Sequence, residues 1–237
     1  MITVYPYENL GHVNHGWLDA RHHFSFASYW NPKRTHFGKL RVINDDRVMP
    51  GKGFATHAHT NMEIITYVRQ GAITHKDSMR NEGRTEAGDI QVMSAGSGVS
   101  HSEYNLEKED TQLYQIWIEP NSENVKPYWE TRQFPTLVTN GHLSLLVSGR
   151  IEDHEKNALF IHQDAAIYGG RLKAGAKIEQ PIKYQAYILA SMGSFTVNGT
   201  LLKEGDGAEV RDSKNLTIIA ITDSEILVID VPEEHKD

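Results

Sequence analysis

Residues 53–71 read GFATHAHTNMEIITYVRQG. This stretch is rich in the β-branched and aromatic residues that favour strands, and it carries two histidines, His57 and His59, with Glu63 following them. Side chains two positions apart in a strand point to the same face, so the two imidazoles can face one cation. The stretch therefore predicts a β fold in which a strand carries metal ligands.

The composition limits the classes of protein that the chain can represent. Its 237 residues, 39% hydrophobic and 23% charged, suffice for one large β domain or two smaller ones. No apolar run approaches the ~20 residues of a membrane span, and the start lacks a secretory signal, so we expect a cytoplasmic protein. The net charge of −7 argues against direct nucleic-acid binding. The lack of cysteine excludes disulfides and thiolate sites.

Short strand-like runs fill the chain and repeat weakly between its two halves. An apolar run to a glycine, a second run, a Gly-Asp turn and a last run ending at proline occur in both halves, as EIITYVRQGAITH, EAGDIQVMSAG and LYQIWIEP and again as QAYILASMGSFTVNG, KEGDGAEVRD and EILVIDVP. Residues 119–135 are polar, hold three prolines and indicate a linker without strands. We predict an all-β chain of two tandem barrels, 1–134 and 135–237. The second half has no counterpart of the His57–His59 pair.

A second pair of candidate ligands follows in the segment SGVSHSEYN. His101 and Glu103 also stand two apart, so three imidazoles and one carboxylate could converge between neighbouring strands. Three nitrogens and one oxygen suit a divalent transition metal, namely Fe, Cu, Ni, Mn or Zn. Counting strand positions also lets Glu63 face this metal. The alternative is a scaffold whose histidines are structural, because His-x-His pairs are common on solvated strands.

The motifs resemble those of a known family. Residues 53–71 resemble the first cupin motif, and GDIQVMSAGSGVSHSEYN resembles the second; together with ITHKDSMRNEG and GHVNHGWLDARHHFSFASYWNP they resemble the bacterial branch of the pirins. The resemblance implies a bicupin fold of two jelly-roll domains, with a metal in the first domain only and a monomeric state. The implied ligands are His57, His59, His101 and Glu103, with Glu63 in a supporting layer.

The resemblance also implies an activity. Some pirins resemble quercetin 2,3-dioxygenase, which opens a flavonol ring with O2 and releases CO. We expect a small aromatic substrate, with Glu103 or Glu63 accepting its proton. Tyr67, Met93, Tyr104 and Trp117 are candidates for an apolar pocket, and His75 for a group behind the ligands or a hydrogen-bonded strand end. The alternative function is a metal-dependent redox-sensing regulator that acts through protein partners.

Overall fold

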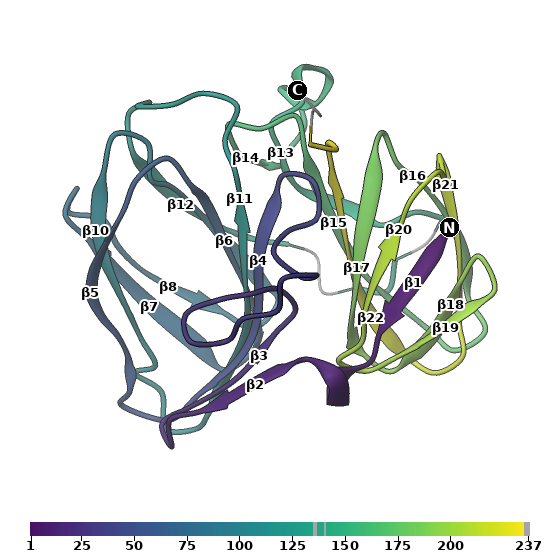
Figure 1. Cartoon of the computed structure of the whole chain (residues 1–237), viewed down its shortest axis with the longest axis horizontal. Helices are drawn as coiled ribbons and strands as arrows, with labels where there is room; N and C mark the ends of the chain where they lie inside the picture. Colours follow the sequence, from purple (N-terminus) through teal and green to yellow (C-terminus); the bar gives the residue numbers. More distant parts are fainter. Residues whose placement is uncertain (135–136, 140, 235–237) are drawn as a thin grey trace.

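The computed structural model describes residues 1–134, 137–139 and 141–234. Within these residues the regular structure is strand apart from two 3₁₀ turns, η1 (Tyr7–Asn9) and η2 (Ile151–Asp153). The strands form four sheets, arranged as two domains that lie side by side (Figure 1). No helix in this part of the chain is long and apolar enough to cross a membrane.

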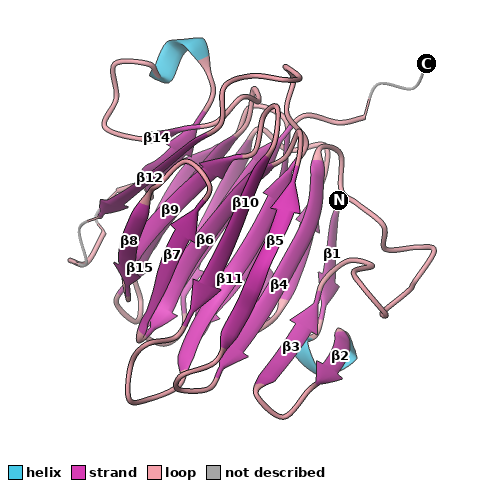
Figure 2. Ribbon diagram, turned by 90° about the vertical axis from the view of Figure 1, so that its left-hand side faces the viewer, coloured by secondary structure: helices cyan, strands magenta, loops and turns pink. Residues whose placement is uncertain are grey.

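The first domain is a sandwich of two antiparallel sheets. Its seven-stranded sheet has the order β12-β9-β6-β11-β4-β3-β2, with β2 (Gly11–Asn14), β3 (Leu18–His22), β4 (Leu40–Val48), β6 (Glu63–Gln70), β9 (Asp89–Ser94), β11 (Thr111–Ile118) and β12 (Tyr128–Gln133). Its four-stranded sheet has the order β5-β10-β7-β8, with β5 (Gly53–His59), β7 (Ala72–Asp77), β8 (Glu82–Glu86) and β10 (Val99–Tyr104). Figure 2 shows the four strands of this smaller sheet side by side.

The second domain repeats this architecture. Its seven-stranded sheet has the order β1-β20-β17-β22-β15-β13-β14, with β1 (Ile2–Tyr5), β13 (Ser144–Ser148), β14 (Leu159–Phe160), β15 (Ala166–Leu172), β17 (Gln185–Met192), β20 (Gly207–Val210) and β22 (Ser224–Val231). Its four-stranded sheet has the order β16-β21-β18-β19, with β16 (Lys177–Pro181), β18 (Ser194–Val197), β19 (Thr200–Lys203) and β21 (Asn215–Ala220). The predicted all-β fold of two tandem jelly rolls is confirmed, as open sandwiches rather than closed barrels.

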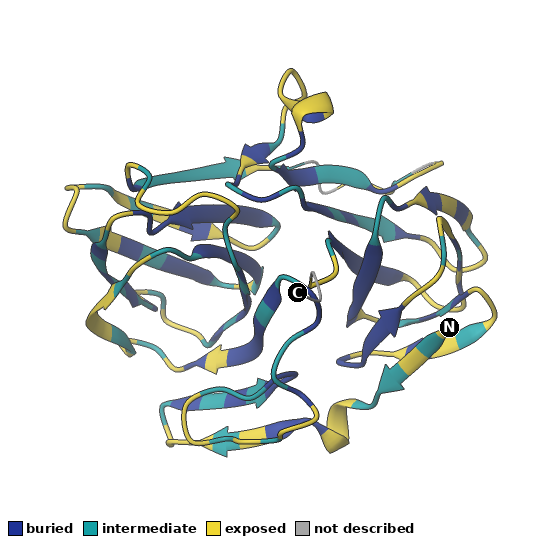
Figure 3. Ribbon diagram, turned by 45° about the horizontal axis from the view of Figure 1, so that its top comes forward, coloured by how far each residue is buried: buried dark blue, intermediate teal, exposed yellow. Residues whose placement is uncertain are grey.

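The larger sheets of the two domains pack against each other. Ile65 and Tyr114 of the first domain belong to the same buried apolar cluster as Leu189 and Leu227 of the second. Figure 3 shows that the strands in this region are largely buried, whereas the outer loops are exposed. The central strands of each large sheet are therefore buried on both faces, one against the small sheet of the same domain and the other against the other domain.

Two features of the domain organisation differ from the sequence-based expectation. Strand β1 pairs with β20, with Ile2 opposite Val210, so the first residues join the second domain and not the first. Residues 119–135 contain a strand that was not expected, because β12 pairs with β9 along its whole length. The pattern of β12 is polar because it is an edge strand that is only half-buried. The proposed boundary near residue 134 stays a prediction.

His23 lies in a buried polar cluster that joins the two domains. The Tyr187 hydroxyl accepts a hydrogen bond from Arg34 Nη2 at 3.1 Å and donates its own proton to His23 Nδ1 at 3.0 Å. Arg34 also forms an ion pair with Glu209 of the second domain. Burial and then the nearby charge of Arg34 lower the pKa of His23 to about 3.

We expect His23 to make the fold sensitive to acid. Its pKa is about 3 in the folded chain against an ordinary 6.5, so the unfolded chain binds the proton first and stability is lost as the pH falls from 6.5 towards 3. Between pH 7.5 and 5.5 this linkage should lower the free energy of unfolding by about 1.4 kcal/mol. Urea unfolding at both pH values should show a loss smaller by this amount in His23→Gln. Equal losses in the two proteins would contradict the assignment.

Candidate metal centre

Strand pairing in the small sheet of the first domain brings the candidate residues together. Strand β10 lies between β5 and β7, and its His101 stands directly opposite His57 on one side and Asp77 on the other. Glu103 stands opposite His75 in the same way. Cross-strand neighbours share a face, so these side chains all point into the sandwich.

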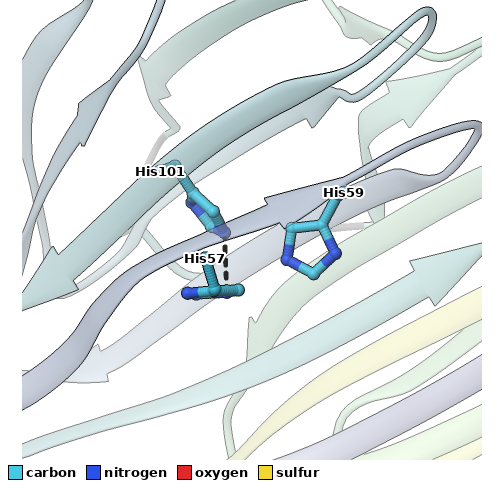
Figure 4. Close-up of side chains that lie close together, drawn as sticks. All are labelled: His57, His59 and His101. Atoms are coloured by element: carbon cyan, nitrogen blue, oxygen red, sulfur yellow. Dashed lines mark hydrogen bonds between the residues drawn. The ribbon is translucent and has the colours of Figure 1, made fainter.

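Three imidazoles form the core of the site. One ring nitrogen each of His57, His59 and His101 lie within 4.8 Å of one another, and Figure 4 shows the three rings gathered from two neighbouring strands. His57 is exposed, His59 is half-buried and His101 is 3% exposed, so the group runs from the surface into the interior. Such a group is capable of holding a divalent metal ion.

Hydrogen bonds behind the rings determine which nitrogens carry protons. Asp77 accepts a hydrogen bond from His75 Nε2 at 3.1 Å, which leaves His75 Nδ1 as an acceptor for His101 Nδ1 at 3.4 Å. Burial lowers the pKa of His75, and burial with the neighbouring histidines lowers that of His101 to about 3, so both rings are neutral at pH 7. His101 therefore turns the lone pair of its Nε2 towards His57.

His57 and His59 turn ring nitrogens to the same place. His57 Nδ1 donates to the carbonyl oxygen of Ala55 at 2.7 Å, and its Nε2 lies 3.1 Å from His101 Nε2, the contact drawn as a dashed line in Figure 4. Two ring nitrogens this close are held together by a shared proton or by a cation between them. His59 Nε2 is buried without a hydrogen-bond partner among the described residues. Burial and then His57 lower the pKa of His59 to about 4. The donor set therefore fits a metal ion.

Glu103 is a buried carboxyl next to this group. It belongs to a second set of potential ligands with His75 and His101, whose ligand atoms also lie within 4.8 Å of one another. Gln91 Nε2 donates to Glu103 Oε1 at 2.5 Å, and Gln115 Nε2 donates to Oε2. Burial raises the pKa of Glu103 to about 7, although the amide hydrogen bonds oppose this shift. Such a carboxyl can accept or donate a proton near neutral pH.

An apolar wall of aromatic rings borders the histidines. The ring of Trp117 contacts that of His59 edge to face, with centroids 4.9 Å apart, and Phe26 contacts Trp117 in the same manner at 5.4 Å. Met93 and Ile64 belong to one apolar cluster with Trp117. Met93 and Trp117 thus lie in one cluster beside His59, and their role in a pocket stays a prediction, whereas Phe26 was not anticipated.

The structure places two other predicted pocket residues elsewhere. Tyr67 faces the second domain, where its hydroxyl donates to Glu225 at 2.9 Å and its ring joins the interdomain cluster. Tyr104 follows Glu103 directly, so alternation along β10 turns it to the opposite face, where its ring lies against Gly53. The pocket assignment of Tyr67 and Tyr104 is therefore corrected.

Glu63 also lies away from the histidines. Ser94 donates to Glu63 Oε1 at 2.8 Å, and His162 Nδ1 of the second domain lies 3.4 Å from the same oxygen. Within the described residues Glu63 belongs to neither potential ligand set. Its side chain points to the domain interface because neighbouring Ile64, and not Glu63, faces the interior with Trp117. The expected place of Glu63 in the layer that supports the ligands, or as proton acceptor, is corrected accordingly.

Two open jelly rolls in tandem, with a histidine cluster in the first and none among the described residues of the second, define a bicupin with one candidate metal centre. Residues 4–118 match the family model described as Pirin, and residues 145–231 match that of the quercetinase C-terminal cupin domain. The chain belongs to the pirin family.

Relatives and solved structures extend this likeness over the full chain. A Pseudomonas aeruginosa protein, named provisionally as a quercetin 2,3-dioxygenase, is 50% identical over 98% of this chain and 100% of its own. An Escherichia coli K12 protein named quercetin 2,3-dioxygenase is 40% identical over 98% of this chain and 99% of its own. The bacterial pirin YhhW of Escherichia coli, in complex with nickel(II), superposes with a TM-score of 0.91, 40% identity and coverage of 98% and 100%.

Proposed function

We propose that this protein is a metal-dependent dioxygenase that opens the ring of flavonols such as quercetin with O2 and releases CO. The observation that carries the proposal is the convergence of His57, His59 and His101 beside the aromatic wall. The names of the relatives from Pseudomonas aeruginosa and Escherichia coli support the same activity. The reaction then requires a metal ion, O2 and a planar aromatic substrate.

The metal would be held by the three imidazoles, with Glu103 as the carboxylate that can complete the set. His101 anchors the group because it is buried and belongs to both potential ligand sets. The nickel(II) in YhhW supports a divalent transition metal without excluding Fe, Cu, Mn or Zn here. When bound, such an ion acts as a Lewis acid that makes a chelating hydroxyl more acidic.

Glu103 is the group that we propose as the proton acceptor. Its pKa of about 7 keeps part of the carboxyl ionised at neutral pH, and it lies in an interior that excludes water. Gln91 and Gln115 hold its two oxygens and so limit its orientation. The carboxylate would take the proton of the flavonol 3-hydroxyl, which increases the electron density of the ring that reacts with O2.

The aromatic wall would orient the flat substrate. Trp117 lies between His59 and Phe26, so a ring that reaches the histidines also contacts these apolar faces. Met93 in the same cluster offers a polarisable surface. Contact with such a wall favours planar aromatic compounds over small polar ones.

Metal analysis combined with turnover tests this proposal. The purified protein reconstituted with Ni(II), Fe(II) or Mn(II) should bind about one metal per chain, because the histidine cluster lies in the first domain and the described part of the second domain has no such cluster. With quercetin it should consume oxygen and release CO, and removal of the metal by a chelator should abolish both. A fully loaded protein that consumes no oxygen with quercetin would refute the flavonol activity and favour a redox-sensing binding protein.

A further inference from the structure

We propose that Trp129 and Asp77 are positioning residues that together orient His101 and Glu103, the buried residues of the metal centre. Each acts through side chains that contact His101 or Glu103. The inference rests on the proposed metal centre. Trp129 lies on β12, in a segment whose sequence indicated only a linker, and neither residue belongs to a potential ligand set among the described residues.

The first chain of contacts runs from Asp77 to His101. Asp77 Oδ1 accepts backbone N–H groups of Met79 and Asn81, while its Oδ2 accepts from the Asn81 amide at 2.9 Å and from His75 at 3.1 Å. His75 and Asp77 side chains are 0% and 1% exposed. A carboxylate held by this many donors gives His75 a single tautomer, and His75 then accepts from His101 Nδ1. A ligand histidine is commonly fixed by such a contact.

The second chain of contacts runs from Trp129 to Glu103. Trp129 Nε1 donates to Gln91 Oε1 at 3.3 Å, and the Thr85 hydroxyl donates to the same oxygen at 2.9 Å. With its oxygen engaged in this way, the Gln91 amide must direct its nitrogen to Glu103. The indole N–H and the Thr85 hydroxyl therefore together determine which end of Gln91 faces the carboxylate.

Trp129 connects the two series of contacts because its ring also stacks on His75. The ring planes are 8° from parallel with centroids 5.1 Å apart. Space for the indole exists because Gly83 stands opposite His75 on the neighbouring strand. A Cβ atom at Gly83 would lie 2.2 Å from Cη2 of Trp129, so any other residue there would displace the ring. One side chain thus supports the groups that orient both His101 and Glu103.

Two substitutions of Trp129 separate its two contacts. Trp129→Phe keeps a ring over His75 and loses the N–H bond to Gln91, so we expect turnover to fall about tenfold while Ni(II) affinity stays within about threefold of wild type. Trp129→Leu loses both contacts and should also weaken Ni(II) binding by about tenfold or more. Trp30→Phe, at an indole that is 71% exposed, is the matched control and should change neither.

Asp77→Asn tests the series of contacts from Asp77 through His75 to His101. The asparagine oxygen can still accept the backbone N–H groups, but its amide turns a donor towards His75 and reverses the tautomer of that ring. We expect Ni(II) affinity to fall about 10- to 100-fold. The ligand-field bands of the Co(II) protein should also shift, and this second readout reports ligand geometry, which loss of folding stability alone would not change. Glu82→Gln, an exposed carboxyl on the adjacent strand, should leave the Co(II) spectrum unchanged.

The outcomes distinguish this inference from the proposed function. A wild-type protein that binds no Ni(II) would refute the metal centre and, with it, the inference. A wild-type protein that binds Ni(II), with Asp77→Asn and Trp129→Leu binding it equally well and giving the same Co(II) spectrum, would refute positioning alone. Gly83→Ala displaces the indole while leaving Asp77, His75, Gln91 and Glu103 themselves unchanged, and it should reproduce the Trp129→Leu result if Trp129→Leu fails to fold. Two equivalents of metal per wild-type chain would make His75 a ligand and overturn the inference.

Discussion

Replacement of His101 by alanine should abolish metal binding and quercetin turnover together. His101 is the one residue that both potential ligand sets share within the described chain, and it is buried, so water cannot readily take its place. The truncation removes a ligand and also leaves His75 Nδ1 without its donor. We expect metal affinity to fall by about 100-fold or more, because even changes behind a ligand cost about 10- to 100-fold.

Elemental analysis and oxygen uptake measure this result directly. His57→Ala should also lose most metal, although its exposed position lets solvent compensate in part. His15→Ala replaces an exposed histidine outside both sets and should retain full occupancy and turnover. A His101→Ala protein that keeps one metal per chain would show that the three imidazoles are not the ligands.

The second large effect should separate the two carboxylates. Glu103→Gln removes the proposed proton acceptor while keeping its size, so turnover should fall by about 100-fold or more, in line with the usual contribution of a general base. Glu63→Gln should keep turnover within about threefold, because Glu63 contacts Ser94 and His162 at the domain interface and not the histidines.

Stability provides the complementary measurement. Burial raises the pKa of Glu63, and its Oε2 has no hydrogen-bond partner in the described part of the chain, so the neutral amide should be tolerated at the domain interface. The Glu63→Gln variant should therefore unfold cooperatively. Urea unfolding of both variants, measured before steady-state kinetics with quercetin, ensures that folded proteins are compared. Loss of turnover in Glu63→Gln with retention in Glu103→Gln would reverse the proposed roles.

Period-two alternation explains which site predictions were reliable. His57 and His59 lie within one strand, as do His101 and Glu103, so counting positions correctly placed each pair on one face. The count fails between His59 and Glu63, because β5 ends before β6 begins and Asn61, with a φ of 46°, turns the chain between them. Tyr67 lies four positions after Glu63 in β6, so it shares the face of Glu63 and also points away from the histidines.

Contacts between distant segments could not be predicted in this way. Trp129 and Phe26 reach the site only through strand pairing and loop packing that bring residues 26, 117 and 129 near the histidines. The polar pattern of β12 resembles a loop because an edge strand is only half-buried. The aromatic residues of this polar segment, Tyr128 and Trp129 among them, carry no local signal of their neighbours.

The local pattern of residues was sufficient to specify an all-β chain, its duplication and the pairs of candidate ligands, because strand periodicity is a short-range property. The tertiary structure alone decided which carboxylate lies beside the histidines, that the first strand completes the second domain, and that one indole supports both His75 and Gln91. These features depend on strand order and register, which arise from burial of the sheets against each other and not from any short stretch of sequence.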